Sequence, residues 1–185
     1  MTINKKKHSH QKGFTLLELL VVIAIIGLLS SIAVVALQNV RAEARDTKRL
    51  ADVRQILLAL EIYHEQFGEY PVHGFQFNCG VPGHGFSPGG YNYIPGLVTE
   101  NIMPTLPVDP LYNDAIPHEY CYSYFLYHDP GAYNCDTSRG RFFVLYIKDL
   151  ETWDGPGQHP SSPGWTCGDY DWVAPYDWAT GGWEN

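Results

Sequence analysis

The sequence lacks the short motifs of the common catalytic and metal-binding sites. It contains no HExxH, no P-loop, no GxSxG and no dinucleotide-binding fingerprint, and its four cysteines form no CxxC pair. These absences argue against the enzyme classes that depend on those motifs and against a zinc ribbon. We therefore expect no enzymatic activity and no resident cofactor.

Basic side chains are scarce beyond the N-terminus. Residues 1–13 contain four lysines and no acid, and without them the rest of the chain carries a formal net charge of −12. An acidic surface disfavours binding to nucleic acid, so nucleic acid is an unexpected partner.

An apolar run follows the basic segment. Residues 14–37 form a stretch of 24 residues, which as a helix is about 36 Å long and is enough to cross a bilayer core. The lysines before it place the N-terminus in the cytoplasm and the rest of the chain outside. A secretory signal peptide has a shorter apolar core. A plain membrane anchor fits the length but leaves Glu18 unexplained, because a charge inside such a segment is costly.

Residues 38–67 predict an amphipathic continuation of the same helix. No proline or glycine lies between Leu28 and Phe67, and Gly68 and Pro71 follow as stop signals. Apolar residues at spacings of three and four form the stripe expected to face a core. The stripe consists of Leu50, Val53, Leu57, Leu60, His64 and Phe67. Charged residues dominate the other faces, namely Arg41, Glu43, Arg45, Asp46, Lys48, Arg49, Asp52 and Arg54.

Residues 68–185 predict a globular head, which gives an α+β fold class with a small antiparallel sheet packed on the long helix. A short helical turn is expected within 93–104, and the aromatic and β-branched runs 118–127 and 141–150 predict an antiparallel hairpin. Residues 151–185 hold all five tryptophans and predict loop with one added short strand. We interpret the tryptophans as core filler, with a sugar-stacking or adhesive surface as the alternative.

The string Lys12-Gly13-Phe14-Thr15-Leu16-Leu17-Glu18, followed by the apolar run, resembles the processing site and N-terminal helix of type IV prepilins and of pseudopilins. The run LPVDP at 106–110 and the segment from Tyr120 to Tyr124 resemble a loop and first strand of major pseudopilins and some pilins. The resemblance implies a ladle-shaped pilin fold, cleavage of the leader 1–13 between Gly13 and Phe14, and methylation of the new Phe14 amine. It also implies that Glu18 pairs with that amine on a neighbouring subunit, because an unpaired charge in apolar surroundings is expensive.

The function that the resemblance implies is that of a structural subunit of a type IV pilus. The alternatives are a major pseudopilin of a type II secretion or competence system and, from another class, a membrane-anchored binding domain that never polymerises. The implied partners are further copies of the chain, a prepilin peptidase, an assembly platform with its ATPase, and the cytoplasmic membrane before assembly. The implied final location is an extracellular or periplasmic filament. Many pilins have a proline where this chain has Val35, so we expect a continuous helix.

The cysteines favour two disulfides in an exported domain. The predicted hairpin places Cys121 at its open end and Cys135 in its connection, which argues against a bond between these two. We expect the pairs Cys79–Cys121 and Cys135–Cys167.

Three aspartates near the C-terminus raise the question of calcium. Asp169, Asp171 and Asp177 lie in a turn-rich segment, and the resembled major pseudopilins hold calcium in a C-terminal loop. No EF-hand spacing is present, so these are weak candidates and solvated turn residues are the favoured interpretation.

Overall fold

The structure, a computed structural model, describes residues 14–73, 93–113, 120–155, 157–172 and 176–185. The chain divides into two compact units, Met1–Arg41 and Ala42–Asn185. The predicted leader with Gly13, and also Cys79, lie outside the described residues.

Helix α1 spans Leu16–Phe67. Its part within the first unit is exposed along its whole length, and its most apolar window has a mean hydropathy of 3.0, so it is long and apolar enough to cross a membrane. The helix continues through Val35 without a break, as predicted. It ends at Gly68, whose φ of 73° suits glycine and whose N–H donates to the His64 carbonyl over 2.8 Å.

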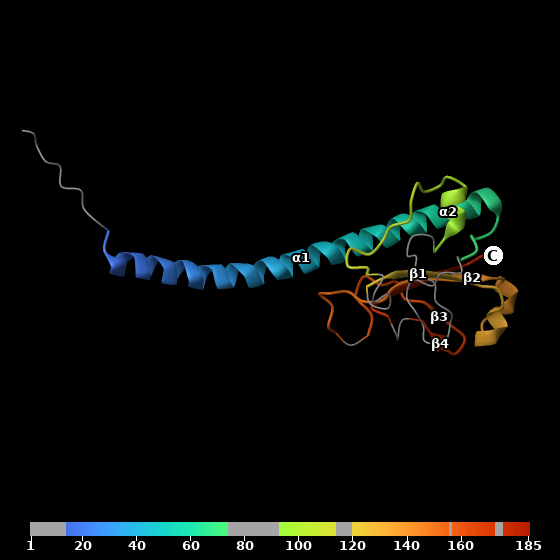
Figure 1. The fold of residues 1–185 in the computed structure, drawn as a ribbon. Helices are drawn as coiled ribbons and strands as arrows, with labels where there is room; N and C mark the ends of the chain where they lie inside the picture. Colours follow the sequence, from blue (N-terminus) through green and yellow to red (C-terminus); the bar gives the residue numbers. More distant parts are fainter. Residues whose placement is uncertain (1–13, 74–92, 114–119, 156, 173–175) are drawn as a thin grey trace, which may run out of the picture. The chain divides into compact units, whose positions relative to one another are not determined.

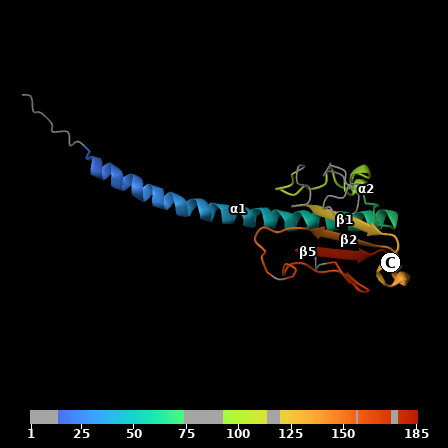
Figure 2. The same ribbon diagram turned by 60° about the horizontal axis from the view of Figure 1, so that its bottom comes forward.

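The second unit is built on a three-stranded antiparallel sheet. Its strands are β1 (Tyr122–Tyr127), β2 (Phe142–Ile147) and β5 (Trp178–Trp183), in the order β1-β2-β5. The predicted hairpin is confirmed as β1 and β2, with Tyr122 opposite Ile147. Figure 2 shows β2 between its two neighbours.

The remaining elements are short. Helix α2 (Pro95–Thr99) confirms the predicted helical turn, and two 3-10 turns, Pro130–Tyr133 and Thr137–Arg139, lie between β1 and β2. The added C-terminal strand is confirmed as β5, and a two-stranded ribbon of β3 (Thr166–Cys167) and β4 (Tyr170–Asp171) accompanies it.

The main core lies between the sheet and the part of α1 that belongs to the second unit, which run side by side in Figures 1 and 2. Val53 and Leu60 of the predicted stripe are fully buried. Phe67 is not, since 45% of it is exposed, whereas Ile56 and Ala59 are buried instead. The stripe that faces the core is therefore shifted around the helix from the predicted one.

A second apolar cluster includes β2 residues that do not join the main core. Phe142, Val144 and Tyr146 pack there with Trp172 and Cys167, so that every residue of β2 is buried. All five tryptophans belong to one of the two clusters or pack against it. The interpretation of the tryptophans as core filler is confirmed for Trp172 and Trp178, which are buried, whereas the other three are partly buried.

Candidate functional site

Two polar arrangements stand out among the described residues, and the first is at the start of α1. The Glu18 carboxylate accepts hydrogen bonds from the backbone N–H and the hydroxyl of Thr15, each over 2.8 Å. The Thr15 hydroxyl in turn accepts a bond from the Glu18 N–H over 3.2 Å. This is a capping box, in which a threonine before the first helical turn and a glutamate three residues later satisfy the free N–H groups of the helix end.

The capping box explains how an acid is held at the start of an apolar helix. Glu18 is the only charged residue among residues 14–40. Neighbouring Phe14 is 76% exposed, so the position after the predicted cut projects away from the rest of the chain. Thr15 was not foreseen as a partner of Glu18, although the spacing T-x-x-E before an apolar run is a recognised signal of a helix start.

The second arrangement is a buried ion cluster centred on Arg49. Its guanidinium is completely buried and donates from Nε and Nη2 to the two carboxylate oxygens of Asp109 over 2.7 and 2.9 Å. Its Nη1 donates to Asp46 and, over 2.7 Å, to Glu151. Asp109 lies in the run LPVDP at 106–110, and so this loop is fixed to α1 by a two-bond charged pair.

The carboxylates of Asp46 and Glu151 extend the cluster to the segment after β2. Arg45 donates hydrogen bonds from its Nε and Nη2 to the two carboxylate oxygens of Glu151. Asp46 accepts from the N–H groups of Glu151 and Thr152 over 3.0 and 2.8 Å, and from the Thr152 hydroxyl over 2.7 Å. Three segments that are distant in sequence therefore meet at one polar centre.

The prediction that these charged residues occupy exposed faces of the helix is wrong for three of them. Asp46, Arg49 and Asp52 are buried. Asp52 accepts from the Tyr122 hydroxyl over 2.8 Å and also from Lys48. Burial of such charges is tolerable because each has a partner of opposite charge or a hydrogen-bond donor.

The surroundings fix the protonation of the cluster. Burial by itself would lower the pKa of Arg49, but its hydrogen bonds to Asp109 and Glu151 outweigh burial and raise the pKa. Burial likewise acts to raise the pKa of Asp46, and the donors of Thr152 and Glu151 outweigh it, so this pKa lies below its usual range. The bonds from Arg45 lower the pKa of Glu151. These three groups are therefore charged at neutral pH.

One predicted disulfide is confirmed. Cys135 and Cys167 are bonded, with their Cα atoms 5.1 Å apart. Cys121 is also disulfide-bonded, and because its predicted partner Cys79 lies outside the described residues, that pairing stays a prediction.

The three weak calcium candidates have separate roles. Asp177 accepts from the Leu150 N–H over 2.6 Å, Asp169 accepts from the Asn134 amide, also over 2.6 Å, and Asp171 lies on β4. Within the described ranges, no three His, Cys, Asp or Glu side chains gather as a metal site requires. We propose no calcium site from them.

Comparison with known proteins finds one family profile and several relatives of the chain. The family profile for the prokaryotic N-terminal methylation motif matches residues 8–34. The type II secretion system core protein G of Escherichia coli K12 is 34% identical over 106 residues, which is 57% of this chain and 70% of that protein. No solved structure matches the chain.

Fimbrial proteins match over shorter stretches. The type IV major fimbrial protein FimA of Dichelobacter nodosus is 43% identical over 53 residues, and a fimbrial protein of Neisseria meningitidis serogroup B is 39% identical over 61 residues. These matches cover 29% and 33% of this chain, and 34% and 36% of the two relatives. Together, the methylation motif, the apolar helix behind it and the long match to core protein G show that the chain belongs to the family of type IV pilins and type II secretion pseudopilins.

Proposed function

We propose that this pilin-family chain is a precursor that is cut between Gly13 and Phe14 and then polymerises into a filament through its N-terminal helix. The observation that carries the proposal is the exposed apolar part of α1, which contains a single charge, Glu18, near its start. Apolar surface of this extent needs a bilayer before assembly and other copies of the same helix afterwards.

Cleavage changes the electrostatics of the N-terminus in two ways. It removes Lys5, Lys6, Lys7 and Lys12, which hold the precursor with its leader in the cytoplasm and its head outside. It also creates an amine at Phe14, which we propose the prepilin peptidase then methylates. This amine is the cation that Glu18 of a neighbouring subunit requires.

The capping box gives Glu18 a defined state before that pairing. In the structure its carboxylate is held by Thr15 of its own chain, so the acid has hydrogen-bond donors even without a neighbour. In the assembled filament, the amine of the neighbouring Phe14 supplies the opposite charge. The pair then sets the register between subunits more than it adds stability.

Two settings for the filament are proposed. The first is a type IV pilus used in adhesion, motility or DNA uptake, where the chain is built into a surface fibre by an assembly platform and ATPase. The second is a pseudopilus of a type II secretion or competence system, and the 106-residue match to core protein G, longer than the fimbrial matches, favours it. In both settings the role is structural rather than enzymatic.

Filament assembly by Glu18 variants tests the proposal. In cells that assemble the filament, Glu18→Ala should abolish or strongly reduce fibres while the chain is still made and cut. Glu43→Ala is the matched control, since Glu43 is an exposed acid on the same helix, and it should assemble normally. Normal fibres from Glu18→Ala would contradict the assigned role of Glu18.

Electron microscopy of the same cells separates the two settings. Fibres of the chain in sheared surface material support a surface pilus. Fibres confined to the periplasm support a pseudopilus. A chain that stays monomeric in the membrane would support the alternative of a membrane-anchored binding domain that never polymerises.

A further inference from the structure

We propose that one exposed face of α1 in the head is a contact surface for the head of a second copy of this chain, an inference that rests on the proposed polymerisation. We call it the outer face and define it by Arg54, Leu58, Ile62 and Glu65. All four residues are exposed, and their spacings of three and four place them on one side of the helix. They belong to the second compact unit, so the outer face lies within one body.

The outer face carries aliphatic side chains that the fold does not cover. Val53, Ile56 and Leu60 are the residues through which this part of α1 packs into the main core, and they are fully buried. The side of a helix turned away from a core is ordinarily polar. Here Leu58 is 64% exposed and Ile62 is 41% exposed, one turn apart. A partner that covered both would remove apolar surface from water, which is favourable by about 25 cal/mol per Å².

A positive charge lies at one end of the outer face and a negative charge at the other. Arg54 and Glu65 are three helical turns apart, which is about 16 Å. Arg54 has no acid within reach along its own helix. The residues three and four positions before and after it are all apolar, namely Leu50, Ala51, Leu57 and Leu58.

Glu65 lies one turn from an acid on each side. Glu61 precedes it by four positions and Glu69 follows it by four, a spacing at which like charges repel. Glu61 accepts from the Tyr70 hydroxyl over 3.2 Å, and Glu69 accepts from Arg141 over 2.8 Å. The Glu65 side chain makes no hydrogen bond or ion pair with the described residues. A cation from outside the chain would offset this repulsion.

Few cations of the head are left to serve a partner. Every lysine and arginine beyond residue 13 lies in the described ranges. Arg139 lies over the Trp183 ring. In the part of the chain that the structure describes, only Arg41 and Arg54 lack a partner, and of these only Arg54 belongs to the second unit. The remaining basic side chains form ion pairs, namely Arg45, Lys48, Arg49, Arg141 and Lys148.

A staggered contact between two copies satisfies both charges. If two parallel α1 helices are displaced by three turns, Glu65 of one copy lies level with Arg54 of the other. Ile62 then lies level with Ala51, an exposed small residue that permits close approach. Without the displacement, Arg54 would face Arg54 and Glu65 would face Glu65, and like charges across an interface are costly. The outer face therefore favours a staggered arrangement of heads over one in register.

Charge reversal on the full chain tests the contact. The variants are Arg54→Glu, Glu65→Arg and the two combined, in cells that assemble the filament, with fibres counted by electron microscopy. Each single reversal places like charges together and should lower the yield of fibres about tenfold. The double variant restores opposite charges and should assemble nearly as well as the wild type. All three should keep the thermal midpoint of the wild-type chain in detergent, because both positions are exposed.

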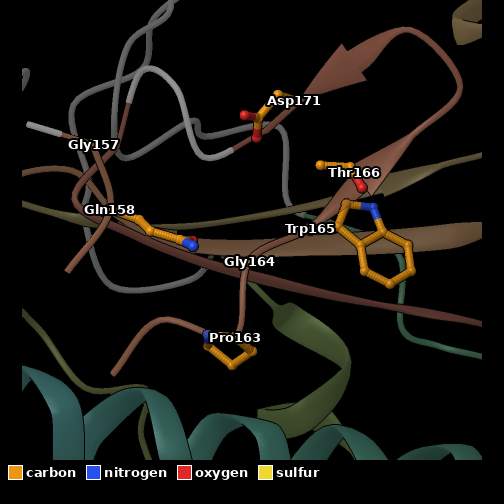
Figure 3. A pocket seen from close by; sticks show the side chains of 7 residues that line it. All are labelled: Gly157, Gln158, Pro163, Gly164, Trp165, Thr166 and Asp171. Carbon is orange, nitrogen blue, oxygen red and sulfur yellow. The ribbon is translucent and has the colours of Figure 1, made fainter. Parts of the chain in front are cut away.

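The matched control is a charge placed on another part of the head. Gln158 is exposed and lines a pocket between the loop 157–164 and the β3–β4 ribbon (Figure 3). Trp165 of the same lining packs in the second apolar cluster, which contains the β2 residues that point away from α1. Gln158→Glu and Gln158→Arg change the charge of the head away from the outer face, and both should assemble normally.

Cross-linking tests the same contact by proximity. Copies with Arg54→Cys and copies with Glu65→Cys, made in the same cell, should form a disulfide-linked dimer on oxidation. Copies with Arg54→Cys and copies with Gln158→Cys should not.

The outcomes separate this contact from the proposed function. Normal fibres from both single reversals would overturn the contact, and so would a double variant that assembles no better than the single ones. Absence of the Arg54→Cys and Glu65→Cys dimer from wild-type-like fibres would overturn it as well. In all these cases polymerisation through the N-terminal helix still stands. A wild-type chain that forms no fibres would contradict the proposed function and the contact together.

Discussion

Arg49 and Asp109 form a charged pair from which water is excluded, with both side chains completely buried. The two parallel hydrogen bonds between them join α1 to a loop that lies 60 residues further along the chain. A pair of this kind adds little net stability compared with apolar packing. Removing one partner, however, strongly destabilises the fold, because the other charge is left buried and unpaired. It therefore specifies where the loop sits on the helix.

Asp109→Ala should strongly destabilise the head. The substitution leaves the Arg49 guanidinium buried without its two-bond partner, and we expect a loss of about 3–5 kcal/mol in the free energy of unfolding. Urea denaturation of the full chain in detergent measures it. Asp149→Ala is the control, because the Asp149 side chain is 46% exposed and lies 4.0 Å from Lys148, and it should cost less than about 1 kcal/mol. Equal losses of unfolding free energy in the two variants would show that the buried pair contributes no more to stability than an exposed one.

Stability should fall as the medium becomes acidic. The pKa values of Asp46 and Glu151 are lowered in the folded chain, so the unfolded chain binds protons at higher pH than the folded one. Their contribution is complete above the unfolded values, about 3.9 and 4.3, and is lost as pH falls through the lower folded values. The midpoint of thermal unfolding should therefore drop between about pH 5 and pH 2. In Asp46→Asn the drop should be shallower, and a midpoint that rises on acidification would contradict this account.

Asp177 changes the pH dependence of stability in the opposite direction from Asp46 and Glu151, and so it serves as a control. Burial raises its pKa, so the folded chain holds this proton at higher pH than the unfolded chain does. Protonation of Asp177 therefore adds to the stability of the fold below its pKa in the unfolded chain, and this stability is lost as pH rises through its pKa in the folded chain. Asp177→Asn keeps an acceptor for the Leu150 N–H and removes this opposing term. The drop on acidification should then become steeper than in the wild type.

Gly181→Ala should destabilise the sheet. A Cβ at this position would meet the Trp165 ring and would come within 2.6 Å of the Phe143 carbonyl oxygen, which is fixed in β2. Overpacking of this kind costs about 2 kcal/mol. Gly27→Ala is the contrasting variant, since no atom lies within 4 Å of its added Cβ, and helix propensity favours alanine there by about 1 kcal/mol. Thermal unfolding of the head should respond to the first substitution and not to the second.

The Cys135–Cys167 bond closes a loop of 32 residues in sequence separation. Replacing both cysteines by serine should lower the free energy of unfolding by about 3–4 kcal/mol through the gain in freedom of the unfolded chain. Urea denaturation measures the loss, and reduction of the wild type, which also breaks the disulfide of Cys121, should lower the free energy of unfolding at least as much. Peptide mapping without reduction should find Cys135 linked to Cys167, and Cys79 linked to Cys121. A peptide linking Cys135 to Cys121 would contradict both assignments.

Much of the fold could be predicted because its elements have strong periodic signals. The apolar run 14–37 and the stretch without proline or glycine from Leu28 to Phe67 predicted α1, and the aromatic and β-branched runs predicted β1 and β2. β5 was expected only as a short added strand, because Gly181 and Gly182 interrupt its pattern. Those glycines are required by the close approach of Trp165 and Phe143, a contact that only the folded sheet reveals.

The ion cluster could not be predicted from the pattern. A charged residue on a helix is ordinarily assigned to an exposed face, and Asp46, Arg49 and Asp52 are buried only because their partners come from distant segments. The capping box is the opposite case, since Thr15 and Glu18 are three residues apart and their spacing alone contains the signal.

The proposed function depends on the loss of the leader by cleavage between Gly13 and Phe14. Mass spectrometry of the protein purified from its native membrane or filament tests this most directly. We expect an N-terminal peptide that begins at Phe14 and carries a methyl group on its amine. A peptide that begins at Met1 or retains Lys5–Lys12 would rule out cleavage at Gly13 and leave a plain membrane anchor as the explanation of the apolar helix.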